Sequence, residues 1–202
     1  SLLYTNGAMY EAARLATVNQ PTCALVSGFH HAGYDNWENF GYFCTFNGLV
    51  ISALKLIQEG KNVAIIDCDM HWGNGTDNIL NHLNLNSKIY HFTFGKQLLN
   101  AVNYMDCLDG HVRKMLTKFS PDVILYQAGA DVHIEDPYGG IFTTDEIFKR
   151  DLLMFEIAKS LKSSIAWNLA GGYQVEKDGS IQKVLDIHLN TFKACQEVYQ
   201  IH

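Results

Sequence analysis

The segment from Asp67 to Thr76 has the sequence Asp-Cys-Asp-Met-His-Trp-Gly-Asn-Gly-Thr and follows the apolar run Val63–Ile66. Side chains alternate along an extended chain, so Asp67, Asp69 and His71 are expected to point to one side. Two carboxylates and an imidazole are a typical ligand set for zinc or another divalent cation. A surface turn with solvated acids is the alternative, because acidic residues are common in turns after strands. The pattern favours a metal site.

Further polar groups follow short apolar runs, each beside glycine, which allows close approach of the main chain. These groups are the pair His30-His31, Asp131 and Tyr173. Each has an ordinary alternative: one histidine packed and the other exposed, a helix cap at Asp131, and a helix-flanking aromatic at Tyr173. His133 and Asp136 are interpreted as loop residues near the site, not as ligands. Together with the Asp67–Thr76 segment, these three polar groups make four such turns, which are difficult to explain by solvation alone.

The elements that must position these groups alternate between helix and strand. Apolar residues with helical spacing occur in Ala8–Val18, Asn47–Gln58, Gly110–Phe119, Thr144–Leu161 and Ile181–Tyr199. Short apolar runs expected to be buried parallel strands are Cys23–Ser27, Val63–Asp67, Lys88–Phe94, Val123–Gln127 and Ile165–Ala170. This order predicts an α/β fold, a three-layer α/β/α arrangement with a mainly parallel sheet. Its strands would bring the polar turns to one carboxyl edge.

Composition limits the functional classes. Of 202 residues, 48% are hydrophobic and 18% charged, which predicts one globular domain over residues 1–202. A net charge of −6 argues against direct nucleic-acid binding. No apolar run approaches the roughly 18–20 residues of a membrane span. The 5 cysteines lack CxxC spacing, and with no secretory signal they indicate reduced thiols and a soluble, cytoplasmic protein, or a nuclear one in a eukaryote.

Taken in order, several segments resemble the zinc-dependent histone deacetylase family, which includes bacterial acetylpolyamine and acetoin-utilisation relatives. The matching segments are Gly28–Ala32, Phe43–Asn47, Asp67–Thr76, Gln127–Asp131 and Ala170–Tyr173. The resemblance runs from about Gly7 to the end of the chain. It implies an arginase/deacetylase-like fold and hydrolysis of an N-acyl amide, most simply acetyl, on a lysine side chain or a polyamine.

The resemblance implies one zinc ion per chain, bound by Asp69, His71 and Asp131. Three protein ligands and an open position are typical of catalytic zinc, which agrees with the chemistry expected from the residues themselves. Tyr173 would place its hydroxyl on the developing oxyanion.

The resemblance also assigns roles to the histidine pair and its partners. His30 and His31 would act on the bound water and the leaving amine, one as general base and the other as proton donor. Asp67 would orient His30 and contribute to a structural potassium site. Asn74 would face His31, where an amide holds an imidazolium less strongly than a carboxylate would.

Substrate recognition is where the chain departs from the family. Phe43 matches a wall of the family's acyl channel, and Gly172 would lie beside that channel. Tyr42 replaces a glycine that usually precedes the Phe-Cys pair, and Gly95 begins a segment where relatives carry a histidine and an aromatic loop. The family's N-terminal portion, which supplies a rim loop with an acidic residue, has no counterpart in these 202 residues.

Three functional hypotheses remain at this point. The first is a zinc-dependent deacetylase acting on an acetylated lysine peptide or an acetylpolyamine. The second is a non-catalytic relative that keeps zinc and binds an acyl-lysine or a metabolite. The third is an arginase-like enzyme with two metal ions, which ranks lowest because Gly171-Gly172-Tyr173 stands where a second carboxylate-rich turn would be needed. The oligomeric state is not fixed by the sequence.

Overall fold

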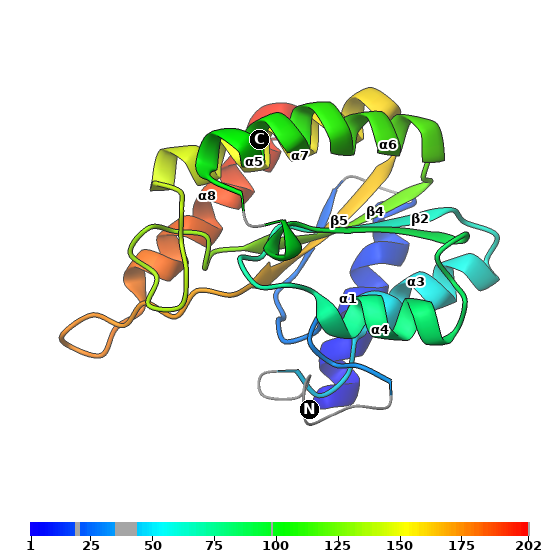
Figure 1. Ribbon diagram of the computed structural model, residues 1–202, viewed down its shortest axis with the longest axis horizontal. Helices are drawn as coiled ribbons and strands as arrows, with labels where there is room; N and C mark the ends of the chain where they lie inside the picture. Colours follow the sequence, from blue (N-terminus) through cyan, green and yellow to red (C-terminus); the bar gives the residue numbers. More distant parts are fainter. Residues whose placement is uncertain (19–20, 35–43, 98, 202) are drawn as a thin grey trace.

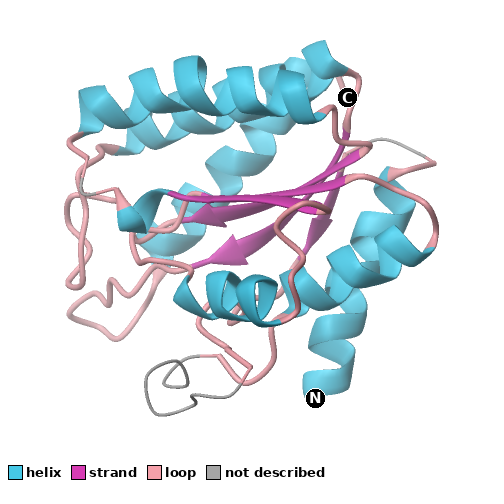
Figure 2. Cartoon of the chain, turned by 45° about the vertical axis from the view of Figure 1, so that its right-hand side comes forward, coloured by secondary structure: helices cyan, strands magenta, loops and turns pink. Residues whose placement is uncertain are grey.

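A parallel sheet lies between two layers of helices (Figures 1 and 2). The structure is a computed structural model that describes residues 1–18, 21–34, 44–97 and 99–201. The strands are β1 (Thr22–Ala24), β2 (Val63–Asp67), β3 (Ile89–Thr93), β4 (Val123–Gly129) and β5 (Ser164–Ala170). Their order is β1-β5-β4-β2-β3, and every pairing is parallel. The predicted three-layer α/β/α class is confirmed.

Burial on both faces explains why the central strands are continuously apolar. In β2, Val63 and Ile65 face one helical layer, whereas Ala64 and Ile66 face the other, and all four are fully buried. β4 is buried along its whole length in the same way. Parallel strands covered on both faces are expected to lack the alternation of a half-exposed strand.

The two helical layers pack against separate cores. One layer contains α1 (Leu2–Ala16), α3 (Gly48–Gln58) and α4 (Asn74–His82). The other contains α5 (Ala101–Asp106), α6 (Arg113–Phe119), α7 (Thr144–Leu161) and α8 (Gln182–Tyr199), with the wider turn η2 (Cys107–Val112) between α5 and α6. Figure 1 shows these layers on opposite sides of the sheet; the short turn η1 (Phe94–Lys96) follows β3. None of the helices in the described part of the chain combines the length and hydropathy needed to cross a membrane.

Helix α7 has the bounds expected from sequence, and its start has a clear local cause. The hydroxyl of Thr143 accepts the N–H of Glu146, while the Glu146 carboxylate accepts the N–H of Thr143. This reciprocal capping satisfies two N–H groups that have no partner within the helix. The helix ends at Leu161, and the next residue, Lys162, caps it with a left-handed φ of 57°.

Other elements differ from the sequence-based expectation. Strand β1 ends at Ala24, not at Ser27, and helix α1 begins at Leu2, before the apolar spacing at Ala8 becomes regular. Helices α4 and α5 were not expected. Helix α4 begins inside the glycine-rich segment after β2, where the intrinsic helix propensity is low, so tertiary packing must supply its stability.

Register brings polar residues to one edge of the sheet. Asp67 at the end of β2 pairs with Thr93 on β3 and with Gln127 on β4, and Gln127 pairs with Asn168 on β5. The loops that carry the histidine pair, Asp69, Asp131 and Tyr173 all begin just beyond this row. The fold therefore gathers the predicted site residues at the carboxyl edge, where open α/β sheets form their sites.

Candidate active site

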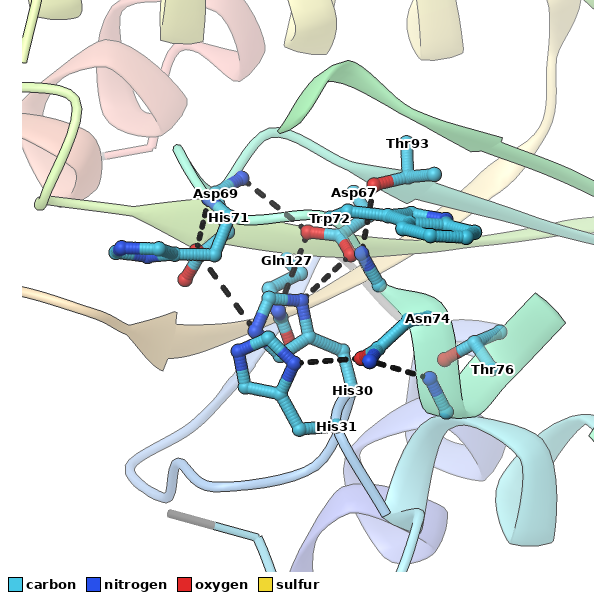
Figure 3. A network of polar contacts seen from close by, with 12 residues as sticks. His30, His31, Asp67, Asp69, His71, Trp72, Asn74, Thr76, Thr93 and Gln127 are labelled. Carbon is cyan, nitrogen blue, oxygen red and sulfur yellow. Dashed lines mark hydrogen bonds and ion pairs between the residues drawn. The ribbon is translucent and has the colours of Figure 1, made fainter. Parts of the chain in front are cut away.

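His30 is held by a buried carboxylate. Its Nδ1 lies 2.8 Å from Oδ2 of Asp67, a side chain with no exposed surface (Figure 3). Oδ1 of Asp67 accepts from Gln127 Nε2 at 3.1 Å and from the Asp69 N–H at 3.2 Å. Burial alone would lower the pKa of His30, but the charges of Asp67 and Asp69 outweigh it and raise that pKa to about 9. The surroundings of His30 therefore favour its protonated form.

His31 has a different partner. Its Nδ1 lies 2.7 Å from Oδ1 of Asn74, and its ring centroid is 4.1 Å from that of His30 (Figure 3). Burial and the neighbouring charge of His30 lower the pKa of His31. The two environments shift the pKa values of these adjacent histidines in opposite directions, so that one ring favours the charged form and the other the neutral form. Such a split separates an acid from a base within one site.

The start of α4 is built against this histidine pair. Asn74 is the first residue of α4, and the N–H of Thr76 donates to the carbonyl of His30 at 3.1 Å. A Cβ at Gly75 would lie 2.4 Å from the main-chain carbon of His31, so only glycine permits this approach. The glycines after β2 therefore place a helix directly behind the histidines.

Asp69, His71 and Asp131 form a cluster whose ligand atoms all lie within 4.8 Å of one another. Nδ1 of His71 is 2.8 Å from Oδ2 of Asp131 and 3.2 Å from Oδ1 of Asp69. The other Asp131 oxygen accepts the N–H of Met70 at 3.1 Å. One nitrogen and two carboxylate oxygens thus converge from the loops after β2 and β4. It is the one such metal-ligand group in the described part of the chain.

The buried negative charge of this cluster favours a bound cation. Burial and the charge of Asp69 raise the pKa of Asp131 to about 7. Hydrogen bonds to Asp131 and Asp69 raise the pKa of His71 to about 10. Burial alone would also raise the pKa of Asp69, but the charge of His30 and a hydrogen bond with His71 lower it. Buried carboxylates this close together need positive charge to balance them. A zinc ion would provide that balance, and the N/O donor set suits it.

A buried arginine supports the main chain on both sides of the cluster. Arg150 has no exposed surface, and its Nη1 donates to the carbonyl of Cys68 at 3.2 Å and to that of Gly129 at 2.7 Å. These carbonyls lie just before Asp69 and Asp131. Cys68 itself is fully buried in the α5–α8 core, so its side chain faces away from the ligands.

Tyr173 lies in the loop after β5, close to the same carboxylates. Gly171 precedes it with a left-handed φ of 54°, and a Cβ there would lie 2.6 Å from Oδ1 of Asp131. Burial and the charges of Asp69 and Asp131 raise the pKa of Tyr173, so its phenol keeps its proton and can donate.

A cavity of about 300 Å³ brings these groups together. Its polar lining includes His30, His31, Asp69, Gln127 and Tyr173. The lining is completed by small or apolar residues, among them Ser27, Phe29, Cys44 and Ala170. Every polar group named from the sequence as catalytic or metal-ligating thus lies in this cavity or contacts a residue that lines it.

The structure supports none of the ordinary alternatives for these residues. Asp131 does not cap a helix, since it lies in a turn after β4 and the next helix, α7, begins at Thr144. Tyr173 does not flank a helix, because α8 begins only at Gln182. His30 and His31 do not divide into one core ring and one solvent-exposed ring, since both line the cavity.

The predicted channel residues and potassium site are less defined. Phe43 and Tyr42 lie outside the described residues. At Gly172 an added Cβ would meet Val184 and Ala130, so this glycine permits close loop packing beside the cavity. Potassium near Asp67 stays a prediction. The hydroxyl of Thr93, the residue that pairs with Asp67 in the sheet, accepts the N–H of Gly73 at 2.9 Å.

The sequence interpretation gave no role to Gln127 or Asp136. Gln127 donates to Asp67, and the carboxylate of Asp136 accepts the main-chain N–H of Tyr173 at 2.8 Å. Gln127 could have been recognised from the parallel alignment of its strand with β2. Asp136 could not, because its contact joins two irregular loops.

Comparison with known proteins identifies the family. The Histone deacetylase domain model matches residues 1–94 and 82–190, which together cover most of the chain. The chain therefore belongs to the histone deacetylase family.

Individual relatives agree with this assignment. Histone deacetylase 2 of Arabidopsis thaliana is 30% identical over 183 residues, covering 80% of this chain and 46% of that protein. An uncharacterized protein of Picosynechococcus sp. is 26% identical over 208 residues, covering 93% of this chain and 66% of that protein. The chain thus spans about half to two thirds of the length of these relatives.

The fold has a close structural counterpart. The crystal structure of acetylpolyamine aminohydrolase from Burkholderia pseudomallei superposes with a TM-score of 0.77 at 19% identity, covering 96% of this chain and 62% of that one. At this identity the likeness establishes the fold alone, and it confirms the deacetylase-like arrangement of sheet and helices.

Proposed function

We propose that this chain carries the active site of a zinc-dependent deacetylase, which hydrolyses an N-acetyl amide on a lysine side chain or a polyamine. The observation that carries the proposal is that three groups of side chains meet at one cavity: the Asp69–His71–Asp131 cluster, the histidine pair and Tyr173. Membership of the histone deacetylase family supports it.

The zinc ion would be held by Asp69, His71 and Asp131, and when bound it would polarise the amide carbonyl and lower the pKa of water. The remaining catalytic groups belong to the chain itself. Their roles follow from which partner each one has.

His31 is proposed as the general base. Its Nδ1 faces the amide of Asn74, which does not stabilise an imidazolium as a carboxylate would, so the neutral ring is available to accept a proton from water. His30 is proposed as the acid, because Asp67 holds its Nδ1 at 2.8 Å and favours the protonated ring.

Tyr173 is proposed to donate its phenolic hydrogen bond to the oxyanion that forms when water adds to the carbonyl carbon. Collapse of that adduct breaks the C–N bond, and the amine leaves with a proton from the histidine pair. The products are acetate and a free amine, so one water molecule is consumed for each bond broken.

The proposal is tested by measuring amine release from acetyl-lysine peptides and acetylpolyamines, with the protein loaded with zinc and after its removal by a chelator. Zinc-dependent release supports the proposal, and the preferred substrate distinguishes a protein deacetylase from a polyamine deacetylase. Zinc binding and ligand affinity without release of any amine would instead indicate a non-catalytic relative. Two metal ions per chain would favour arginase-like chemistry.

A further inference from the structure

Two loops beside the proposed catalytic cluster are joined by a buried carboxylate. Asp136 lies in the loop between β4 and α7 and is 7% exposed. Its Oδ2 accepts the main-chain N–H of Tyr173 at 2.8 Å, and its Oδ1 accepts that of Tyr138 at 3.0 Å. Hydrogen bonds to an ionised acceptor are roughly twice as strong as those between neutral groups. The Tyr173 main chain is thus anchored to the loop that begins with Asp131.

A second contact joins the same loops one residue further along. Nε2 of Gln174 donates to Nδ1 of His133 at 2.8 Å, and both side chains are 7% exposed. The other ring nitrogen of His133 lies 3.1 Å from the hydroxyl of Thr144, at the start of α7. Since Nδ1 accepts, Nε2 carries the hydrogen and donates to Thr144. Consecutive residues of the Tyr173 loop are therefore fixed to the Asp131–Tyr138 loop.

The Tyr173 loop needs such anchoring. β5 ends at Ala170 and α8 begins at Gln182, so neither regular element determines where Tyr173 lies. The two preceding residues, Gly171 and Gly172, have φ values of 54° and 94°, and glycine in these conformations has many alternatives. The two contacts restrict the backbone next to the phenol to one of these conformations.

We propose that Asp136 is a positioning residue for Tyr173: it fixes the main chain of the tyrosine relative to the Asp69–His71–Asp131 cluster and so sets where the phenol meets the oxyanion. This inference rests on the proposed deacetylase function. It gives Asp136 a different role from the proposed metal ligand Asp131, which is also an aspartate and lies in the same loop. Loss of Asp136 should reduce catalysis while leaving zinc binding intact.

The test compares wild type with Asp136→Asn, which keeps the shape but turns an N–H donor toward one of the two main-chain N–H groups. We expect kcat to fall by about 10–100-fold, because a misplacement of about 1 Å costs that much, with little change in KM. Zinc content should match wild type. Glu135→Gln is the matched control, since the exposed Glu135 carboxylate has Lys183 as its ion-pair partner, at 2.9 Å.

A double-mutant comparison distinguishes positioning from a general structural role. In a Tyr173→Phe background the phenol is already absent, so adding Asp136→Asn should cause almost no further loss of kcat. Hydrogen exchange gives a readout that does not need turnover: protection of the segment 170–177 should decrease in Asp136→Asn and remain in Glu135→Gln.

Wild-type kcat in Asp136→Asn, or losses that multiply in the double variant, would overturn the role of Asp136. A wild-type protein that releases no amine would overturn the proposed function itself, and the hydrogen-exchange result would then show whether the anchoring exists. If Asp136→Asn does not fold, Asp136→Glu replaces it in the same assays, because it keeps a carboxylate but moves it away from the main-chain N–H of Tyr173. Wild-type kcat in that variant would equally contradict the positioning role of Asp136.

Discussion

Nδ1 of His31 lies 2.7 Å from Oδ1 of Asn74, so an amide, not a carboxylate, supports the second histidine of the pair. Burial and the charge of His30 lower the pKa of His31, and Asn74 leaves it low enough for the ring to be neutral at neutral pH. The proposed base is thereby ready to accept a proton.

Asn74→Asp should therefore raise the pKa of His31, because a carboxylate in contact favours the imidazolium. The base must be neutral to act, so the acidic limb of the pH profile of kcat/KM should move upward by about 1–2 pH units. Activity at mildly acidic pH falls as a result, while the alkaline limb stays in place. A limb that does not move, or that moves downward, would contradict the assignment of His31 as base.

Asp131→Ala removes one of the three convergent ligand atoms and should abolish zinc binding together with turnover. We expect zinc affinity to fall by at least about 100-fold, because even groups that only support metal ligands are typically worth 10–100-fold. Elemental analysis after dialysis and amine release measure the two effects. Asp145→Ala, in the exposed first turn of α7, is the control. Full activity of Asp131→Ala would disprove the metal-site assignment.

Arg150→Met should destabilise the fold strongly. The change leaves Asp151 buried without its ion-pair partner at 2.7 Å and removes a donor from the carbonyls of Cys68 and Gly129. Breaking a buried pair in this way costs about 3–5 kcal/mol of unfolding free energy, to be measured by urea denaturation. Arg113→Met, which breaks a surface pair with Asp109, should cost less than about 1 kcal/mol. Similar losses in both variants would refute the structural role of Arg150.

The environment of Asp77 predicts that part of the free energy of unfolding is lost at acidic pH. Burial alone would raise the pKa of Asp77, but hydrogen bonds from His91, Trp72 and Lys96 lower it below its usual value. The folded pKa is thus below the unfolded one of about 4, so the carboxylate stabilises the fold above that pH. The stabilisation is lost as the pH falls toward the folded pKa.

Wild type should therefore exceed Asp77→Asn in unfolding free energy at neutral pH, and the difference should shrink below about pH 4. Urea denaturation across this range measures it, with the exposed Asp106→Asn as control. A difference that grows on acidification would show that the sign of this argument is wrong.

Much of the fold could be predicted from sequence because its causes are local. β2 has the predicted bounds because a continuous apolar run is what a strand buried on both faces requires, and α7 because Thr143 and Glu146 cap it. Helix α4 could not be predicted. Gly75 is required there because the helix lies against the main chain of His31, and this tertiary contact leaves no local pattern in the sequence.

The site shows the same division. Asp69 and His71 could be paired from their spacing, and Asp131 from its position after another parallel strand. Asp136 and Arg150 could not, because each acts on the main chain of loops distant in sequence, and no local pattern records such a contact.

The most direct test of the central claim is the turnover of Tyr173→Phe with the best acetylated amine substrate, measured at full zinc occupancy. This variant loses only the phenolic hydroxyl. The account predicts that kcat falls by about 100–1,000-fold, the usual loss when one oxyanion donor is removed, while zinc content is unchanged. Wild-type turnover in Tyr173→Phe would contradict the proposed deacetylase mechanism.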